Sequence, residues 1–322
     1  MMANASSPRP SPLKITAAFA AVYLIWGSTY LTIRITIESV PPFLMAGVRF
    51  LLAGAILFAF ARRPRGRPRE RLTWPHWRSA LIIGGLLLLG GNGIVSWSEL
   101  YVDTGLVALV VATVPLWMAL FAPLFGGRRV HFLSGLGIAI GLTGIVVLLH
   151  PGGVNAAHWQ TFVALGAPLT WAIGSLYARR APAPSEPATA TAMEMLAGGA
   201  LLFIAGLIRG ELGDLHISTV SGASLAAFVY LVLIGSLVGY SAYIWLLHNV
   251  SATSASTYAF VNPVVAVLLG ALFLGESVTL LTVIAAALIV VAVALILFSQ
   301  SRARPRVSEA EQPIELPVSE VA

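Results

Sequence analysis

Polar and aromatic side chains recur inside the long apolar runs of this chain, at spacings that place them on single helix faces. Asn92, Ser96 and Glu99 follow one another at intervals of four and three residues, which puts them on one side of a helix. Polar groups are costly inside a bilayer, so they mark a pathway or join helices. The other residues assigned to such faces are Trp26, Tyr30, Trp171, Ser175, Tyr240, Tyr243, Tyr258 and Asn262.

These residue types suit recognition of a solute better than the breaking of bonds. Aromatic edges, amides and hydroxyls can line a pocket for a small amphipathic solute with an amino, carboxyl or ring group. The alternative is that they only join neighbouring helices by hydrogen bonds. The sequence holds no His-Glu-x-x-His motif, no G-x-S-x-G motif and no cysteine, so we expect no catalytic site, no metal and no cofactor.

Two charged residues lie within apolar runs and require separate interpretations. Arg49 lies about six residues inside one run, where it can meet Glu99 or Asp103 and form part of a gate; snorkelling to the headgroups is the alternative. Glu194 lies at a similar depth in another run. Burial among apolar residues disfavours the charged form of a carboxyl group, so Glu194 is the candidate for proton coupling. A hydrogen bond that joins two helices is the alternative role.

Prolines near the middle of two apolar runs predict hinges. Pro115 lies in the run Ala112–Leu116, and Pro263 lies in the run Phe260–Val264. A proline inside a helix removes one backbone hydrogen bond and permits bending. A broken helix at the same place in two halves of a chain is typical of secondary transporters built from repeats.

The elements that must position these residues are membrane spans. Apolar residues make up 58% of the chain and charged residues only 10%, which excludes an ordinary soluble domain. A spanning helix needs about 20 mainly apolar residues. Ten such runs fit the sequence, at roughly 15–35, 43–61, 79–99, 105–125, 132–149, 160–179, 188–208, 222–246, 252–274 and 279–299.

Basic residues predict the orientation of these spans. With ten spans, 16 Lys and Arg residues fall on one side, whereas only Arg34 and Arg209 fall on the other. Basic loops stay in the cytoplasm, so both termini are expected there. The arginines of these short loops also account for the pI near 10.1 without nucleic acid as a partner.

The fold class expected is an all-α integral membrane protein of ten helices, arranged as two five-helix repeats. Five spans per half is an odd number, so the halves insert with inverted topology. Trp26 and Trp171 occupy matching places in the first span of each half. The predicted parts are a cytoplasmic N-terminal segment, a first repeat, a connecting loop, a second repeat and a disordered cytoplasmic tail, at 1–14, 15–149, 150–159, 160–299 and 300–322.

Several stretches resemble EamA-type members of the drug/metabolite transporter superfamily, and within it the YedA-like permeases. They are Ile25–Tyr30, Met45–Phe50, Val110–Leu116, Tyr258–Val264 and Leu274–Glu276. The resemblance implies ten helices, two EamA repeats and, usually, export of amino acids, other metabolites or toxic compounds. Glu276 matches an acidic residue of the family, whereas the first repeat departs from the pattern with Gly127 and Arg128.

The function expected is therefore secondary transport of small metabolites across the cytoplasmic membrane of a prokaryote, with export taken from the resemblance. The runner-up is an uncoupled facilitator or uptake permease, and a membrane enzyme or a channel is less favoured. The partners expected are a small-molecule substrate and the lipid bilayer, and the protein is a monomer or a homodimer.

Overall fold

The computed structural model describes residues 11–63, 70–126, 132–148, 159–250 and 257–302, and these residues form helices without strands. The first half holds α1 (Pro12–Ile37), α2 (Pro42–Ala61), α3 (Trp74–Gly84), η1 (Gly85–Gly93), α4 (Ile94–Ser98), α5 (Thr104–Val111), α6 (Val114–Phe121), η2 (Ala122–Phe125) and α7 (Phe132–Leu148). The second half holds α8 (Trp159–Ala164), α9 (Gly166–Ala178), α10 (Pro187–Ile208), α11 (Glu211–Asp214), η3 (Ile217–Thr219), α12 (Gly222–Tyr230), η4 (Leu231–Tyr240), α13 (Ser241–Asn249), α15 (Tyr258–Leu269), η5 (Gly270–Leu274) and α16 (Leu280–Arg302).

The all-α membrane fold predicted from the sequence is confirmed. Within the described ranges, eight helical segments are long and apolar enough to cross a membrane. The fifth and ninth predicted spans correspond to shorter apolar helices, Phe132–Val147 and Tyr258–Leu274. Nearly all of the predicted connecting loop and of the predicted C-terminal tail lies outside the described residues.

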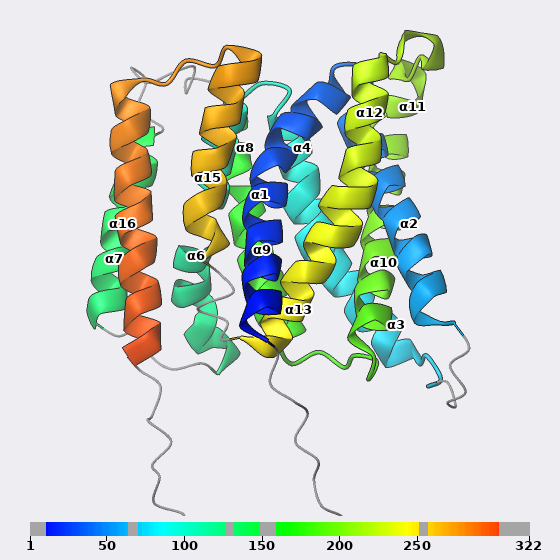
Figure 1. The fold of residues 1–322 in the computed structure, drawn as a ribbon, viewed down its shortest axis with the longest axis horizontal. Coiled ribbons are helices and arrows are strands. Elements are labelled where there is room, and N and C mark those ends of the chain that lie inside the picture. Colours follow the sequence, from blue (N-terminus) through cyan, green and yellow to red (C-terminus); the bar gives the residue numbers. More distant parts are fainter. Residues whose placement is uncertain (1–10, 64–69, 127–131, 149–158, 251–256, 303–322) are drawn as a thin grey trace, which may run out of the picture.

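The long helices stand side by side, with α7 and α16 at one edge and α2, α3 and α10 at the other (Figure 1). The start of α1 and the end of α16 lie on the same face, at the bottom of the view. The end of α2 and the start of α3 lie on that face too, whereas α11 lies on the opposite one. Chain ends on one face require an even number of crossings; the cytoplasmic location of both ends stays a prediction.

Close glycine contacts join the two halves through α2 and α10. A Cβ atom on Gly47 would lie 2.7 Å from the backbone nitrogen of Phe203, and one on Gly199 would lie 2.8 Å from that of Leu51. Small residues let helix backbones approach closely in a membrane. The two helices therefore form a tightly packed pair made of one helix from each half.

Close glycine contacts also join α7 to α16. Gly137 and Gly144 of α7 face the α16 residues Ala292 and Ile289 with no room for a larger side chain. The outer sides of this pair are apolar and exposed, as at Val146, which is 67% exposed. The two nearly all-apolar spans of the sequence thus pack against each other and turn their remaining surface outward.

The expectation of a broken helix in both halves is wrong for the second half. In the first half α5 ends at Val111 and α6 begins at Val114, with Pro115 in its first turn. In the second half Pro263 lies within α15, which continues through it. The Thr113 hydroxyl donates to the Val110 carbonyl at 2.6 Å and stabilises the first break. The hinge role of both prolines stays a prediction.

Two irregular segments that the sequence pattern did not indicate occupy matching spans. The π-helical turns η1 and η4 interrupt the third and the eighth apolar runs. A π-helical turn widens the helix and leaves backbone groups outside the usual hydrogen-bond ladder, and it is frequent at functional sites. Both segments border the cavity described next.

Candidate functional site

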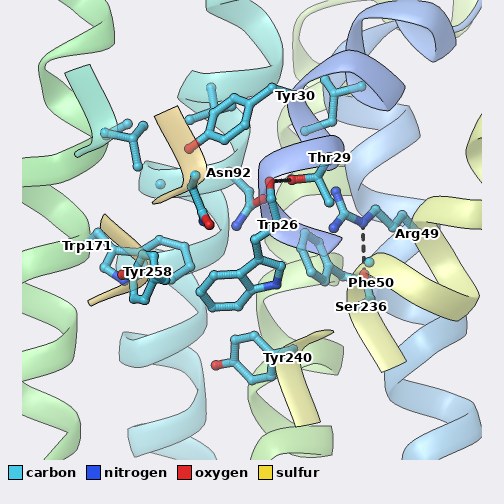
Figure 2. Close-up of a pocket in the computed structure, with 17 residues that line it drawn as sticks. Trp26, Thr29, Tyr30, Arg49, Phe50, Asn92, Trp171, Ser236, Tyr240 and Tyr258 are labelled. Carbon is cyan, nitrogen blue, oxygen red and sulfur yellow. Dashed lines mark hydrogen bonds between the residues drawn. The ribbon is translucent and has the colours of Figure 1, made fainter. Parts of the chain in front are cut away.

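A cavity of about 690 Å³, including its open part, lies between the two halves (Figure 2). Eight of the residues singled out in the sequence line it: Trp26, Tyr30, Arg49, Asn92, Trp171, Tyr240, Tyr258 and Asn262. The first four come from the first half and the last four from the second. The structure therefore brings them together, and their role in binding stays a prediction.

Aromatic rings form one wall of the cavity around Trp26. Its ring lies 6.2 Å from that of Trp171 at an interplanar angle of 85°, and 5.2 Å from that of Tyr258 at 86°. Tyr243 does not line the cavity but lies behind this wall, 4.9 Å from the Trp26 ring. Edge-to-face contacts of this kind fix ring orientations, so the wall is preformed.

Amide groups complete the wall. Asn262 is buried, and with its amide oriented to satisfy its partners the nitrogen donates to the carbonyl oxygens of Tyr23 at 3.2 Å and Tyr258 at 3.3 Å. Asn92 lies in η1 beside Gly91, and its amide points into the group of lining side chains (Figure 2). An amide can both donate and accept, which suits a solute with polar groups.

Arg49 lies in the cavity wall, and the predicted gate between Arg49 and Glu99 is not formed. The Arg49 Nε atom donates to the Ser236 hydroxyl at 2.8 Å instead. Glu99 is buried, and neither of its carboxyl oxygens has a hydrogen-bond partner among the described residues. Arg34 donates to the backbone carbonyl of Glu99. Ser236 could not be paired with Arg49 from spacing, because the two lie on spans far apart in the sequence.

Glu194 does not line the cavity but contacts a residue that does. Its carboxyl Oε2 accepts a 3.0 Å hydrogen bond from the hydroxyl of Tyr240, which lines the cavity. This contact joins α10 to η4, so the helix-joining alternative for Glu194 is met in this structure. Proton coupling stays a proposal.

Four other predicted residues lie away from the cavity. Ser96 is fully buried and its hydroxyl has no hydrogen-bond partner among the described residues, while Val95 lines the cavity in its place. Ser175, Pro115 and Pro263 are also outside the lining. Ser236, which the sequence places on one face with Tyr240 and Tyr243, also lines the cavity. The lining residues that the sequence did not single out for this site are Thr29, Ile33, Phe50, Gly91, Val95, Val111, Ala167 and Gly235.

Acidic side chains stabilise helix ends on the face that carries α11. Glu276 accepts from the backbone nitrogens of Thr104 at 2.7 Å and Gly105 at 3.2 Å, and so caps α5 from the other half of the chain. Glu211 accepts from the backbone nitrogen of Leu44 at 2.9 Å in the first turn of α2. Burial raises the pKa of Glu211, against the effect of its backbone hydrogen bonds. A carboxylate at a helix N-terminus is favourable for the helix dipole.

A second contact between the halves lies on the face that holds both chain ends. Glu70 Oε2 accepts from the Ser185 hydroxyl at 2.6 Å and from its backbone nitrogen at 2.8 Å. These hydrogen bonds lower the pKa of Glu70. The contact joins the α2–α3 connection to the α9–α10 connection.

The sequence profile of the EamA-like transporter family matches the chain twice, over residues 13–150 and 158–298. The chain belongs to this family. It is 43% identical over 290 residues to the inner membrane transporter YedA of Escherichia coli, covering 88% of this chain and 90% of YedA. It is also similar to the transporter YvbV of Bacillus subtilis, at 24% identity over 86% of this chain and 89% of YvbV.

A solved crystal structure supports the fold of this EamA family member. The two chains are 23% identical, with a TM-score of 0.63, and the match covers 90% of this chain and 99% of the solved one. In the part of the chain that the structure describes, no group of three or more His, Asp or Glu side chains could hold a metal ion. The cavity therefore has the groups for binding a solute, and the family is one of transporters.

Proposed function

We propose that the protein is a secondary transporter of the cytoplasmic membrane that exports small amphipathic metabolites, such as amino acids, related compounds or drugs. The observation that carries this proposal is the cavity between the halves, lined by aromatic, amide and hydroxyl groups from both. Solute sites of repeat-built transporters lie near the membrane midplane at the repeat interface. The outward direction follows from the resemblance to the family.

The helix contacts support an inverted repeat of ten spans. Helices α2 and α10 pair across the halves, as do α7 and α16, and each pair is made of equivalent spans. The contact of α1 with α15 has its counterpart in that of α9 with α6. Likewise α9 packs on η1 as α1 packs on η4. Exchanging the halves thus maps these contacts onto one another, as expected for a pseudo-twofold axis.

We propose alternating access for this arrangement. Hydrogen bonds join the halves on both faces, through Glu70 and Ser185 on one and through Glu276 and Thr104 on the other. Opening one face while the other stays closed would expose the cavity to each side in turn. The break at Pro115 and the proline within α15 are the places where the helices can bend.

Counterflow in proteoliposomes tests this proposal. Metabolite profiling of spent medium from deletion and overexpressing cells first supplies a candidate solute. Purified protein in liposomes loaded with unlabelled solute should then accumulate the labelled solute transiently and with saturation. Uptake that rises linearly with concentration and is not stimulated by internal solute would point to a channel and contradict the proposal. Turnover of the solute into another compound would identify an enzyme.

A further inference from the structure

Arg49 brings a fixed positive charge to the cavity without an ion pair among the described residues. It is 4% exposed and lies in α2 within the membrane region. Arginine keeps its charge in proteins. A buried charge without a bonded counter-ion is costly, and such residues inside membrane proteins commonly mark the path of a substrate or ion.

The acidic side chains considered above form no ion pair with Arg49 in the described part of the chain. Glu194 accepts from Tyr240, and Glu276 caps α5. Glu99 acts on Arg49 electrostatically, but no ion pair joins the two. Arg49 therefore lacks a bonded anion within the described residues.

The geometry of Arg49 presents its outer nitrogens to the cavity. The Nε atom is held by Ser236 at 2.8 Å, and the guanidinium carbon lies 4.7 Å from the centre of the Phe50 ring. Figure 2 shows the two terminal nitrogens pointing toward Thr29 and Asn92. Because Nε is held and one face of the guanidinium lies on a ring, the two terminal nitrogens remain as a planar pair of donors. Such a pair can donate two parallel hydrogen bonds to the two oxygens of a carboxylate.

We propose that Arg49 binds the carboxylate of the solute, whose apolar or aromatic part lies against Trp26, Trp171 and Tyr258. This inference rests on the proposed function and narrows the substrate to organic acids with one free carboxylate, zwitterions included. Among the described residues, Arg49 is the only basic residue that lines the cavity, and the other described residues of the lining are uncharged. One cation in an apolar site balances a single negative charge, which disfavours dianions such as phosphate esters.

Equilibrium binding of three matched probes tests the inference. Phenylacetate, phenylacetamide and 2-phenylethylamine share a ring and a short side chain but carry a negative, a neutral and a positive group. Tryptophan fluorescence of the full chain in lipid nanodiscs reports binding, because Trp26 and Trp171 line the cavity. We expect phenylacetate to bind at least about tenfold more tightly than phenylacetamide, the difference expected for a charge-assisted hydrogen bond.

Variants assign the preference to the guanidinium. Arg49→Gln should abolish the difference between phenylacetate and phenylacetamide, and Arg49→Lys should retain part of it because a charge remains without the fork. Ser236→Ala should reduce the preference by loosening Nε. Arg209→Gln is the matched control, since Arg209 also lies over a phenylalanine ring, that of Phe43 at 5.3 Å, but outside the cavity.

Two results would overturn the inference without any variant. They are equal affinity of the unmodified protein for phenylacetate and phenylacetamide, and no saturable binding of phenylacetate in the millimolar range. Preserved preference in Arg49→Gln would overturn it as well. These results can be distinguished from failure of the proposed function. A preference for phenylacetate without counterflow would support the carboxylate site and contradict transport. Counterflow without that preference would support transport and contradict the carboxylate site.

Discussion

Tyr240 connects a partly buried carboxyl group to the cavity, because its hydroxyl donates to Glu194 at 3.0 Å while its ring lines the cavity wall. Glu194 lies on α10 and Tyr240 ends η4, so the hydrogen bond joins two spans of the second half. Protonation of Glu194 turns the acceptor of the Tyr240 hydrogen bond from a carboxylate into a neutral carboxyl group. Glu194 therefore lies one hydrogen bond away from a residue of the cavity wall.

Glu194→Gln should separate exchange from proton-driven accumulation. A protonatable group that reaches both sides in turn can link proton entry to solute exit, and glutamine cannot carry that proton. We expect downhill counterflow to continue and accumulation driven by a pH gradient to be lost. The measurement is uptake of the labelled solute into liposomes with and without a pH gradient.

Tyr240→Phe is the companion variant, since it removes the hydrogen bond and keeps the carboxyl group. It should leave coupling in place, with a changed apparent Km. Glu38→Gln, at the end of α1, is the control. Retained pH-driven accumulation in Glu194→Gln would reduce Glu194 to a residue that joins α10 to η4.

Trp171→Ala should raise the apparent Km by about fivefold or more. The substitution removes an edge-to-face partner of Trp26 and a large part of the aromatic wall, a loss of roughly 1 kcal/mol or more. Trp159→Ala is a matched control, because Trp159 also pairs with a tryptophan, Trp97 at 5.4 Å, but lies outside the cavity. Equal effects of both substitutions on transport would argue against a solute site at Trp171.

Reporter fusions should place both chain ends in the cytoplasm. A fusion after Ser301 and a fusion after Gly210 are expected in opposite compartments, because the described ends lie on one face and the α10–α11 connection on the other. Alkaline phosphatase and fluorescent protein fusions at both positions measure this. An external C-terminus would reverse the assignment of the two faces.

Much of the candidate site could be predicted because spacing within a helix fixes which side chains share a face. Trp26 and Tyr30 lie four residues apart in α1, a regular helix, and both line the cavity. The face of Asn92 and Ser96 crosses the junction between η1 and α4, where π-helical geometry gives way to α-helical geometry. A constant period does not hold across that junction, so Ser96 does not share the cavity face of Asn92.

The helix break at Pro115 and the partner of Arg49 depend on contacts that spacing does not encode. Thr113 donates to Val110 and accepts from the Trp117 indole at 3.1 Å, which stabilises the break; the second half has Val261 in the equivalent place. The Arg49–Ser236 bond joins residues from different halves. Such pairs follow only from the three-dimensional packing of the spans.

Glu276→Ala should lower the stability of the protein by about 1 kcal/mol, the usual cost of losing a helix cap. The substitution leaves the backbone nitrogens of Thr104 and Gly105 at the start of α5 without their carboxylate acceptor. Thermal unfolding in detergent measures the change. Glu38→Ala serves as the control, and equal melting temperatures for the two variants would show that the cap does not stabilise α5.

Acid should release the contact between Glu70 and Ser185. The hydrogen bonds from Ser185 lower the pKa of Glu70 below its ordinary value of 4.5. A lowered pKa means that the charged, bonded state is complete above the ordinary value and is lost as the pH falls through the lowered one. Ser185→Ala removes the hydroxyl hydrogen bond, which is the largest cause of the lowered pKa of Glu70, and keeps the backbone nitrogen as a donor. The pKa of Glu70 should therefore rise, and the contact should be lost at a higher pH.

Spin labels can follow this release, because the chain contains no native cysteine to label by mistake. Labels on Arg71→Cys and Ala181→Cys, which flank the contact, should give a narrow distance distribution at neutral pH and a broader one in acid. Ser185→Ala should shift the midpoint upward, whereas Ser221→Ala, a serine on the opposite face, should not. Identical midpoints in both variants would mean that the Ser185 hydroxyl does not hold Glu70. Because the contact joins the two halves on the face opposite Glu276, we expect its loss in acid to increase access of solute to the cavity from that face as well.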